Sequence, residues 1–159
     1  DGAAVLHVNP ALYQASLVSE SLGGLADVED VAIEITSLDS LARDVGLTGR
    51  GLLKLDIQGA ELTALAGAGV MIASVDVAVL EITIDPGTSA IPDLDAVVAR
   101  MAQLGFVVFD DAGDYRDPTS GSLLQKDLLF MRATHPIRIW RRDGCPPSGP
   151  NSGHSTVDR

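Results

Sequence analysis

Cysteine is almost missing from this chain: among 159 residues, only Cys145 carries a thiol. A single cysteine excludes an internal disulfide framework and fits a reducing compartment, so we expect a cytoplasmic protein. Long apolar runs are missing too. The longest, near residues 75–80, already contains Asp76 and is far shorter than the roughly 20 residues that a spanning helix needs. We therefore expect no membrane span.

Basic side chains are also scarce, with 11 Lys and Arg against 22 Asp and Glu, for a formal net charge of −11. Nucleic acids and anionic membranes attract basic surfaces, so this balance argues against either partner. Histidine is equally sparse. His7, His135 and His154 fall in a predicted strand, at the start of the tail and in the tail, and no G-x-S-x-G motif is present. This pattern argues against catalysis of the Ser-His-Asp kind.

What the chain does contain is enough apolar material, 46% of its residues, for one sizeable core. We expect a single domain over residues 1–134. Residues 135–159 form a tail that ends in "RRDGCPPSGPNSGHSTVDR", where Pro, Gly, Ser and Asn replace apolar side chains. Such a composition predicts disorder.

Apolar periodicity predicts an α/β fold. Helices are expected from Ser37 to Gly46 and over 60–68 and 91–105. Their alternation with strands argues for a mostly parallel sheet, with the last strand returning antiparallel at the edge. The polar loop over 110–125 is long enough to be a lid or specificity loop. Strands are expected at 3–8, 31–35, 52–57, 75–83, 106–109 and 126–132.

Charges interrupt the strand in "GLLKLDIQGAELTALAGA", residues 51–68. Strand periodicity places Lys54, Asp56 and Gln58 on one face near the carboxyl end, where open α/β sheets bind ligands. A purely structural alternative stays open. In it, Lys54 and Asp56 neutralise each other at the sheet rim, and Glu61 is a favourable charge in the first turn of the helix.

A metal site is a further alternative, because Asp56, Glu81 and Asp85 follow neighbouring strands. No His or Cys joins these acids, and acidic rims are common. We expect no bound metal.

The ordered motifs resemble the C-terminal part of the FkbM family of S-adenosylmethionine-dependent methyltransferases, over about residues 1–133. The family hallmark K-x-D-x-[EQ]-G-x-E is matched by Lys54, Asp56, Gln58, Gly59 and Glu61. Further matches are "DGAAVLHVN", "ASL", "ITSLDSL", "VAVLEIT", "LGFVVFD" and "LLQKDLLFMR". The resemblance implies a Rossmann-like class I methyltransferase sheet, with the charged strand as its fourth strand, beside the first.

The same resemblance implies an O-methyltransferase that uses S-adenosyl-L-methionine and a small hydroxylated acceptor, such as a small molecule, sugar or lipid. Such an enzyme mainly aligns donor and acceptor, while a base or hydrogen bond takes the hydroxyl proton. Asp56 is then the candidate for orienting or deprotonating the acceptor, and Lys54 is its partner. Asp56 and Gln58 are candidate cofactor contacts, and Glu61 and Glu81 are candidate substrate contacts at the rim.

The family's glycine-rich first turn and the acid that ends its second strand would lie upstream of Asp1. We therefore expect activity from a longer chain and none from these residues alone. The competing hypothesis is a catalytically silent α/β module or remnant with a binding or structural role. A sheet truncated on its N-terminal side would also leave strand 52–57 with an unpaired apolar edge, which predicts self-association.

Overall fold

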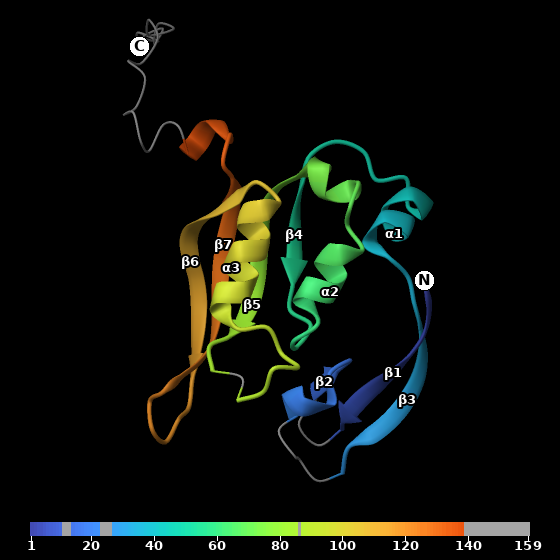
Figure 1. Cartoon of the computed structure of the whole chain (residues 1–159), viewed down its shortest axis with the longest axis vertical. Helices are drawn as coiled ribbons and strands as arrows, with labels where there is room; N and C mark the ends of the chain where they lie inside the picture. Colours follow the sequence, from blue (N-terminus) through green and yellow to red (C-terminus); the bar gives the residue numbers. More distant parts are fainter. Residues whose placement is uncertain (11–13, 23–26, 86, 139–159) are drawn as a thin grey trace, which may run out of the picture.

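The computed structural model describes residues 1–10, 14–22, 27–85 and 87–138 (Figure 1). These residues form two β-sheets, and helices connect several of the strands along the chain. The elements in chain order are β1 (Gly2–Asn9), β2 (Gln14–Ser16), the 3-10 helix η1 (Ser19–Leu22), β3 (Glu29–Ile35), α1 (Leu38–Asp44), β4 (Gly51–Leu55), α2 (Glu61–Ala66), the 3-10 helix η2 (Met71–Ser74), β5 (Val75–Thr83), α3 (Leu94–Gln103), β6 (Phe106–Arg116) and β7 (Leu123–Arg132).

The larger sheet has the strand order β4-β5-β7-β6. β4 and β5 pair in parallel, whereas β7 is antiparallel to both of its neighbours, β5 and β6. Three of the four strands therefore run in one direction, and the fold is α/β. The expectation of an antiparallel strand at the edge was wrong. β7 lies inside the sheet, because the β6–β7 hairpin returns it alongside β5 and leaves β6 at the edge.

The smaller sheet is fully antiparallel, with the order β2-β1-β3. Strands were correctly predicted at 3–8 and 31–35, but their place in one continuous parallel sheet with β4 was not. Parallel neighbours need a crossover of a dozen or more residues, usually a helix, whereas antiparallel neighbours accept short connections. Both β2 and η1 lie in the segment up to residue 27 that was expected to be a loop.

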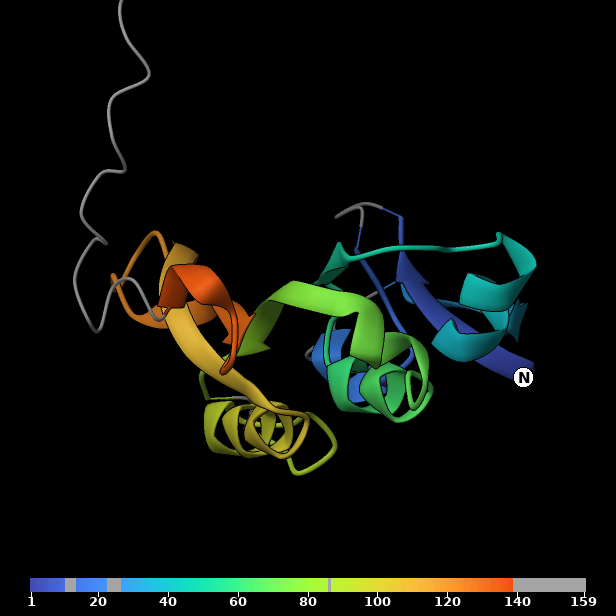
Figure 2. The same ribbon diagram turned by 90° about the horizontal axis from the view of Figure 1, so that it is seen from above.

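The core lies on one face of the larger sheet, where α2 and α3 pack (Figures 1 and 2). The opposite face carries no helix among the described residues, and Leu52 on it is 64% exposed. The alternation along β5 shows the division, because Val77 and Val79 point to the open face and are only half-buried. The helix-covered face holds Ala78, Leu80 and Ile82 of β5 together with Leu65, Val97, Met101, Phe106 and Phe130.

The expected lid over 110–125 is mostly strand, which corrects the sequence-based interpretation. β6 continues to Arg116 and β7 begins at Leu123, so only a tight turn separates them. Asp117 holds this turn by accepting hydrogen bonds from the backbone N–H groups of Thr119 and Ser120, at 2.9 and 2.7 Å. Polar side chains are common on edge strands such as β6. Because they are also typical of loops, the sequence indicated a loop for this segment.

The tail expected at 135–159 lies almost wholly outside the described residues. A helical turn follows β7 at residues 135–138. In it, the Arg138 N–H donates to the His135 carbonyl at 3.0 Å. Residues 139–159, including Cys145, lie beyond the described part. Within the described part, no helix has the length and apolar character needed to cross a membrane.

Candidate functional site

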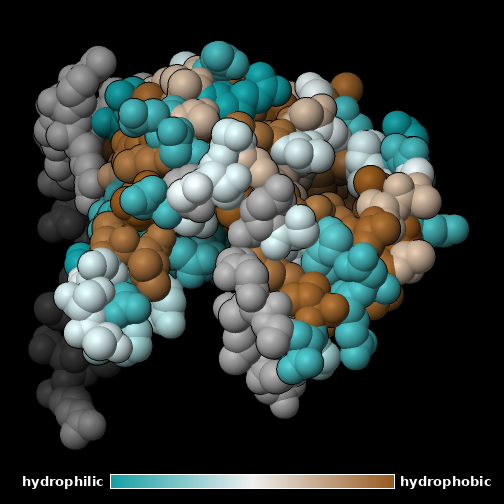
Figure 3. All heavy atoms as spheres, turned by 60° about the horizontal axis from the view of Figure 1, so that its bottom comes forward, coloured by the Kyte–Doolittle hydropathy of each residue, from teal (hydrophilic) through white to brown (hydrophobic). Residues whose placement is uncertain are grey.

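Polar side chains gather at the carboxyl ends of β4 and β5. Asp56 and Gln58 follow β4, and Glu81 lies near the end of β5. Gln125 joins them from the neighbouring strand β7. Figure 3 views the molecule from this end, which opens between the tip of the β6–β7 hairpin and the smaller sheet. The polar group therefore lies at the carboxyl end of the larger sheet.

Lys54 and Asp56 form an ion pair, with 3.0 Å between Lys54 Nζ and Asp56 Oδ2. The hydrogen bond and charge of Asp56 raise the pKa of the Lys54 amine, and the charges of Asp127 and Glu81 raise it further. The two side chains are 54% and 40% exposed, and an exposed pair adds little to stability. The ion pair agrees with the structural alternative, in which Lys54 and Asp56 neutralise each other at the rim of the sheet. It is equally compatible with a functional role for Asp56.

Two glutamine side chains bind one oxygen of Glu81. Gln58 Nε2 and Gln125 Nε2 each donate to Glu81 Oε1 at 2.7 Å. Gln125 Nε2 also lies 3.3 Å from Gln58 Oε1, so the two amides contact each other. Gln58 Nε2 reaches Asp56 Oδ1 at a long 3.5 Å. Three elements thus contribute to one hydrogen-bonded group.

The site is rich in negative charge. In the register of β5 and β7, Glu81 stands directly opposite Asp127, on the open face. Burial raises the pKa of the Glu81 carboxyl, and the charges of Asp56, Asp127 and Glu61 add to the rise, against the opposing hydrogen bond from Gln58. Asp127 Oδ1 is buried without a hydrogen-bond partner. Glu81 consequently holds a proton more readily than an ordinary glutamate.

The turn that presents Gln58 is held from inside the protein. Gln58 and Gly59 both have positive φ, 52° and 98°, a conformation that is unusual for glutamine. Glu61 Oε1 accepts the backbone N–H groups of Ile57 and Gly59 at 3.3 and 3.2 Å. A Cβ on Gly59 would also come within 3.2 Å of Ile91. The backbone of this turn is therefore fixed by a carboxylate and by packing.

Glu61 consequently does not stand at the rim, where it was expected. Only 3% of the residue is exposed, because its carboxylate turns inward to the backbone of the turn. Ser16 holds the same turn from the other side, since its hydroxyl donates to the Gln58 carbonyl at 2.7 Å. Ser16 is 2% exposed and belongs to β2. The smaller sheet thus contacts the candidate site.

Lys54, Asp56, Gln58 and Glu81 were predicted from the sequence and do lie together. Gln125 and Asp127 were missed, although the signal was present. Both are polar residues in the apolar strand "LLQKDLLFMR", the same anomaly that identified Lys54 and Asp56. Which strand pairs with this segment becomes known only from the order of the strands in the sheet.

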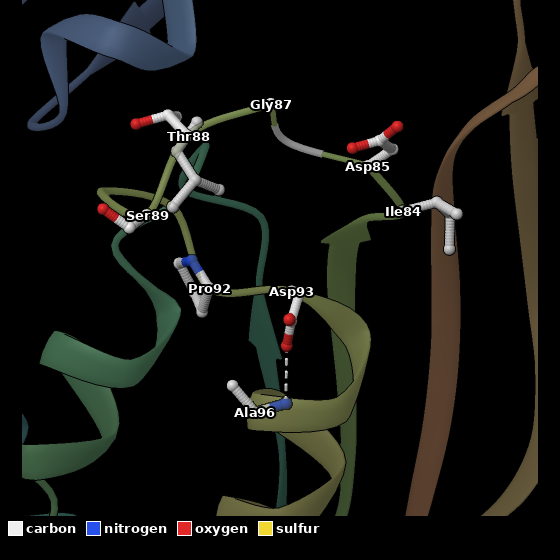
Figure 4. Close-up of a pocket in the computed structure, with 9 residues that line it drawn as sticks. Ile84, Asp85, Gly87, Thr88, Ser89, Pro92, Asp93 and Ala96 are labelled. Atoms are coloured by element: carbon white, nitrogen blue, oxygen red, sulfur yellow. Dashed lines mark hydrogen bonds between the residues drawn. The ribbon is translucent and has the colours of Figure 1, made fainter.

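Asp85 lies apart from these residues and lines a pocket between the end of β5 and the start of α3 (Figure 4). Asp93, on the same wall, caps α3 by accepting the Ala96 N–H at 2.8 Å. Across residues 1–10, 14–22, 27–85 and 87–138, no three Asp, Glu, His or Cys side chains are grouped to hold a metal ion.

Comparison with known families matches residues 5–108 to a family model described as Methyltransferase FkbM domain. The matched span runs from β1 into β6 and includes Lys54, Asp56, Gln58 and Glu81. No curated protein and no solved structure matches the chain.

Proposed function

Because the chain belongs to the FkbM methyltransferase domain family, we propose that its protein transfers a methyl group from S-adenosylmethionine to a hydroxyl of a small molecule, sugar or lipid. One observation carries the proposal. The residues of the family match that stand out chemically, Asp56, Gln58 and Glu81, share a hydrogen-bonded group at the carboxyl end of the larger sheet. Ligands of open α/β sheets bind at this end.

The chemistry of the site suits a hydroxylated acceptor. Carboxylate oxygens accept hydrogen bonds from hydroxyl groups, and amides both donate and accept. Asp56 is 40% exposed and has one oxygen paired with Lys54, so its other oxygen can orient an acceptor. Lys54 fixes the Asp56 side chain and limits the excess negative charge.

The same residues fit the cationic end of the methyl donor. S-adenosylmethionine carries a positive sulfonium and an ammonium group, and the site holds the carboxylates of Asp56, Glu81 and Asp127 against the single amine of Lys54. Asp56 and Gln58 would contact that end, and the donor would supply an activated methyl group.

The residues of the chain would act mainly by alignment. Methyl transfer to oxygen needs the acceptor hydroxyl in line with the methyl–sulfur bond, and correct positioning supplies much of the rate. The doubly held turn at Gln58 and the bound carboxylate of Glu81 provide rigid contacts for that purpose. A carboxylate of the site would receive the hydroxyl proton.

The test is methyl transfer by the complete protein. It is incubated with S-adenosylmethionine labelled in the methyl group and, in turn, with methyl glycosides, long-chain alcohols and hydroxyketones. We expect labelled methyl ether from at least one class. If no class is labelled, while the protein is folded by circular dichroism, the catalytically silent module is the better account.

A further inference from the structure

Resting on the proposed methyl transfer, we infer that Glu81 is the group that accepts the acceptor's proton and that Gln125 is the residue that positions it. The contacts of Glu81 differ from those of Asp56, the residue that the sequence favoured for this role.

Glu81 has one occupied and one open oxygen. Oε1 receives both amides, from Gln58 and Gln125, at 2.7 Å each. Oε2 makes no hydrogen bond with any described residue, and Glu81 is half-buried. Two donors on Oε1 restrict rotation of the carboxylate and keep Oε2 available to a hydroxyl. Asp56, by comparison, has Oδ2 bound to Lys54.

The charges around Glu81 make it the better proton acceptor. Lys54 and Asp56 face it from the β4 side, Glu61 from α2 and Asp127 from β7. Three of these four groups are acidic, and together with burial they raise the pKa of Glu81. A base works best when its pKa approaches the working pH, so this shift favours proton transfer to Glu81.

In the step itself, the acceptor oxygen forms a bond to the methyl carbon while the methyl–sulfur bond breaks. The electron pair of that bond stays on sulfur, which becomes a neutral thioether. The hydroxyl proton moves to Glu81 Oε2, and protonated Glu81 later releases it to water. The products are a methyl ether, the thioether and one proton.

Gln125 enters this step only through Glu81, so its test must follow the ionisation of Glu81. In the complete protein, the Glu81 carboxyl is titrated by carbon-13 NMR in the wild type, in Gln125→Leu and in Gln103→Leu. Gln103 is an exposed glutamine of α3 and serves as the matched control. Removing an amide that binds the charged form should raise the pKa of Glu81 in Gln125→Leu alone.

The pH profile of kcat is then measured with the labelled donor. Activity needs ionised Glu81. In Gln125→Leu, the acid limb of the profile should therefore move to higher pH by the same amount as the pKa of Glu81 measured by NMR. The KM for the donor should stay unchanged. Glu81→Gln should lose about 100-fold or more in kcat while keeping its fold.

Two results would overturn the inference without touching the proposed function: wild-type kcat in Glu81→Gln, or an unmoved acid limb in Gln125→Leu. Failure of the wild type to methylate any acceptor would instead overturn the proposed function, and the proton transfer with it.

Discussion

The hydroxyl of Ser16 donates a hydrogen bond of 2.7 Å to the carbonyl oxygen of Gln58, which lies 42 positions further along the chain. The same hydroxyl accepts the backbone N–H of Val18 at 2.9 Å. One buried side chain therefore joins β2 of the smaller sheet to the turn that carries Gln58. This contact makes the position of that turn depend on both sheets.

Replacement of Ser16 by alanine should remove both hydrogen bonds and leave the Gln58 carbonyl without its partner. We expect a loss of about 1–3 kcal/mol in the free energy of unfolding. Activity should fall as well, because the Gln58 amide is no longer held beside Glu81. Thermal melts and kcat measure the two effects. Ser89→Ala, at an exposed serine, is the control and should change neither; an equal effect there would refute the coupling.

Glu61→Ala should destabilise the same turn from inside. The backbone N–H groups of Ile57 and Gly59 lose their acceptor, and a hydrogen bond to a charged group contributes about 1.5–3 kcal/mol. Urea unfolding compares this variant with Glu34→Ala, whose side chain is exposed on β3. Equal midpoints for the two variants would show that Glu61 does not hold the turn.

Asp39 gives a prediction on pH. Its carboxylate accepts hydrogen bonds from the backbone N–H groups of Met71 and Val70, at 2.7 and 2.9 Å, and these bonds hold the pKa of the Asp39 carboxyl below its ordinary value. A lowered pKa stabilises the fold above the unfolded pKa, and this stability is lost as pH falls through the folded pKa. Asp39→Asn should therefore lower the melting temperature near pH 7 and have a smaller effect near pH 3. Asp44→Asn, at an exposed position, is the control; a constant deficit across pH would contradict the prediction.

The sequence predicted most elements because their signals are local. Apolar alternation identified β3, and the spacing of Leu94, Val97 and Met101 identified α3. The partners of each strand depend on contacts between distant residues. The inserted position of β7 and the separate small sheet were accordingly missed.

Some residues of the candidate site could likewise be predicted from the sequence, and others could not. Charges within an apolar strand singled out Lys54 and Asp56, because burial of a charge needs a reason. The inward direction of Glu61 depends on the backbone of one turn, and the contact of Gln125 with Glu81 depends on the pairing of β5 with β7. Neither can be read from residue spacing.

Self-association remains a prediction, and β4 is where we expect it. No described strand pairs with the outer edge of β4, and Leu52 on this strand is 64% exposed. Unpaired apolar edges recruit other chains. Sedimentation at several concentrations should show association that weakens in Leu52→Lys. A wild type that sediments as a monomer at every concentration would contradict this prediction.

The central claim is that the charged end of β4 serves methyl transfer, and Asp56→Asn tests it most directly. The substitution is nearly isosteric and removes the charge that orients the acceptor. In the complete protein, we predict that kcat with labelled S-adenosylmethionine falls by about 100-fold or more, while the melting temperature stays close to that of the wild type. An unchanged kcat with a lowered melting temperature would show that Asp56 is structural and would contradict the account.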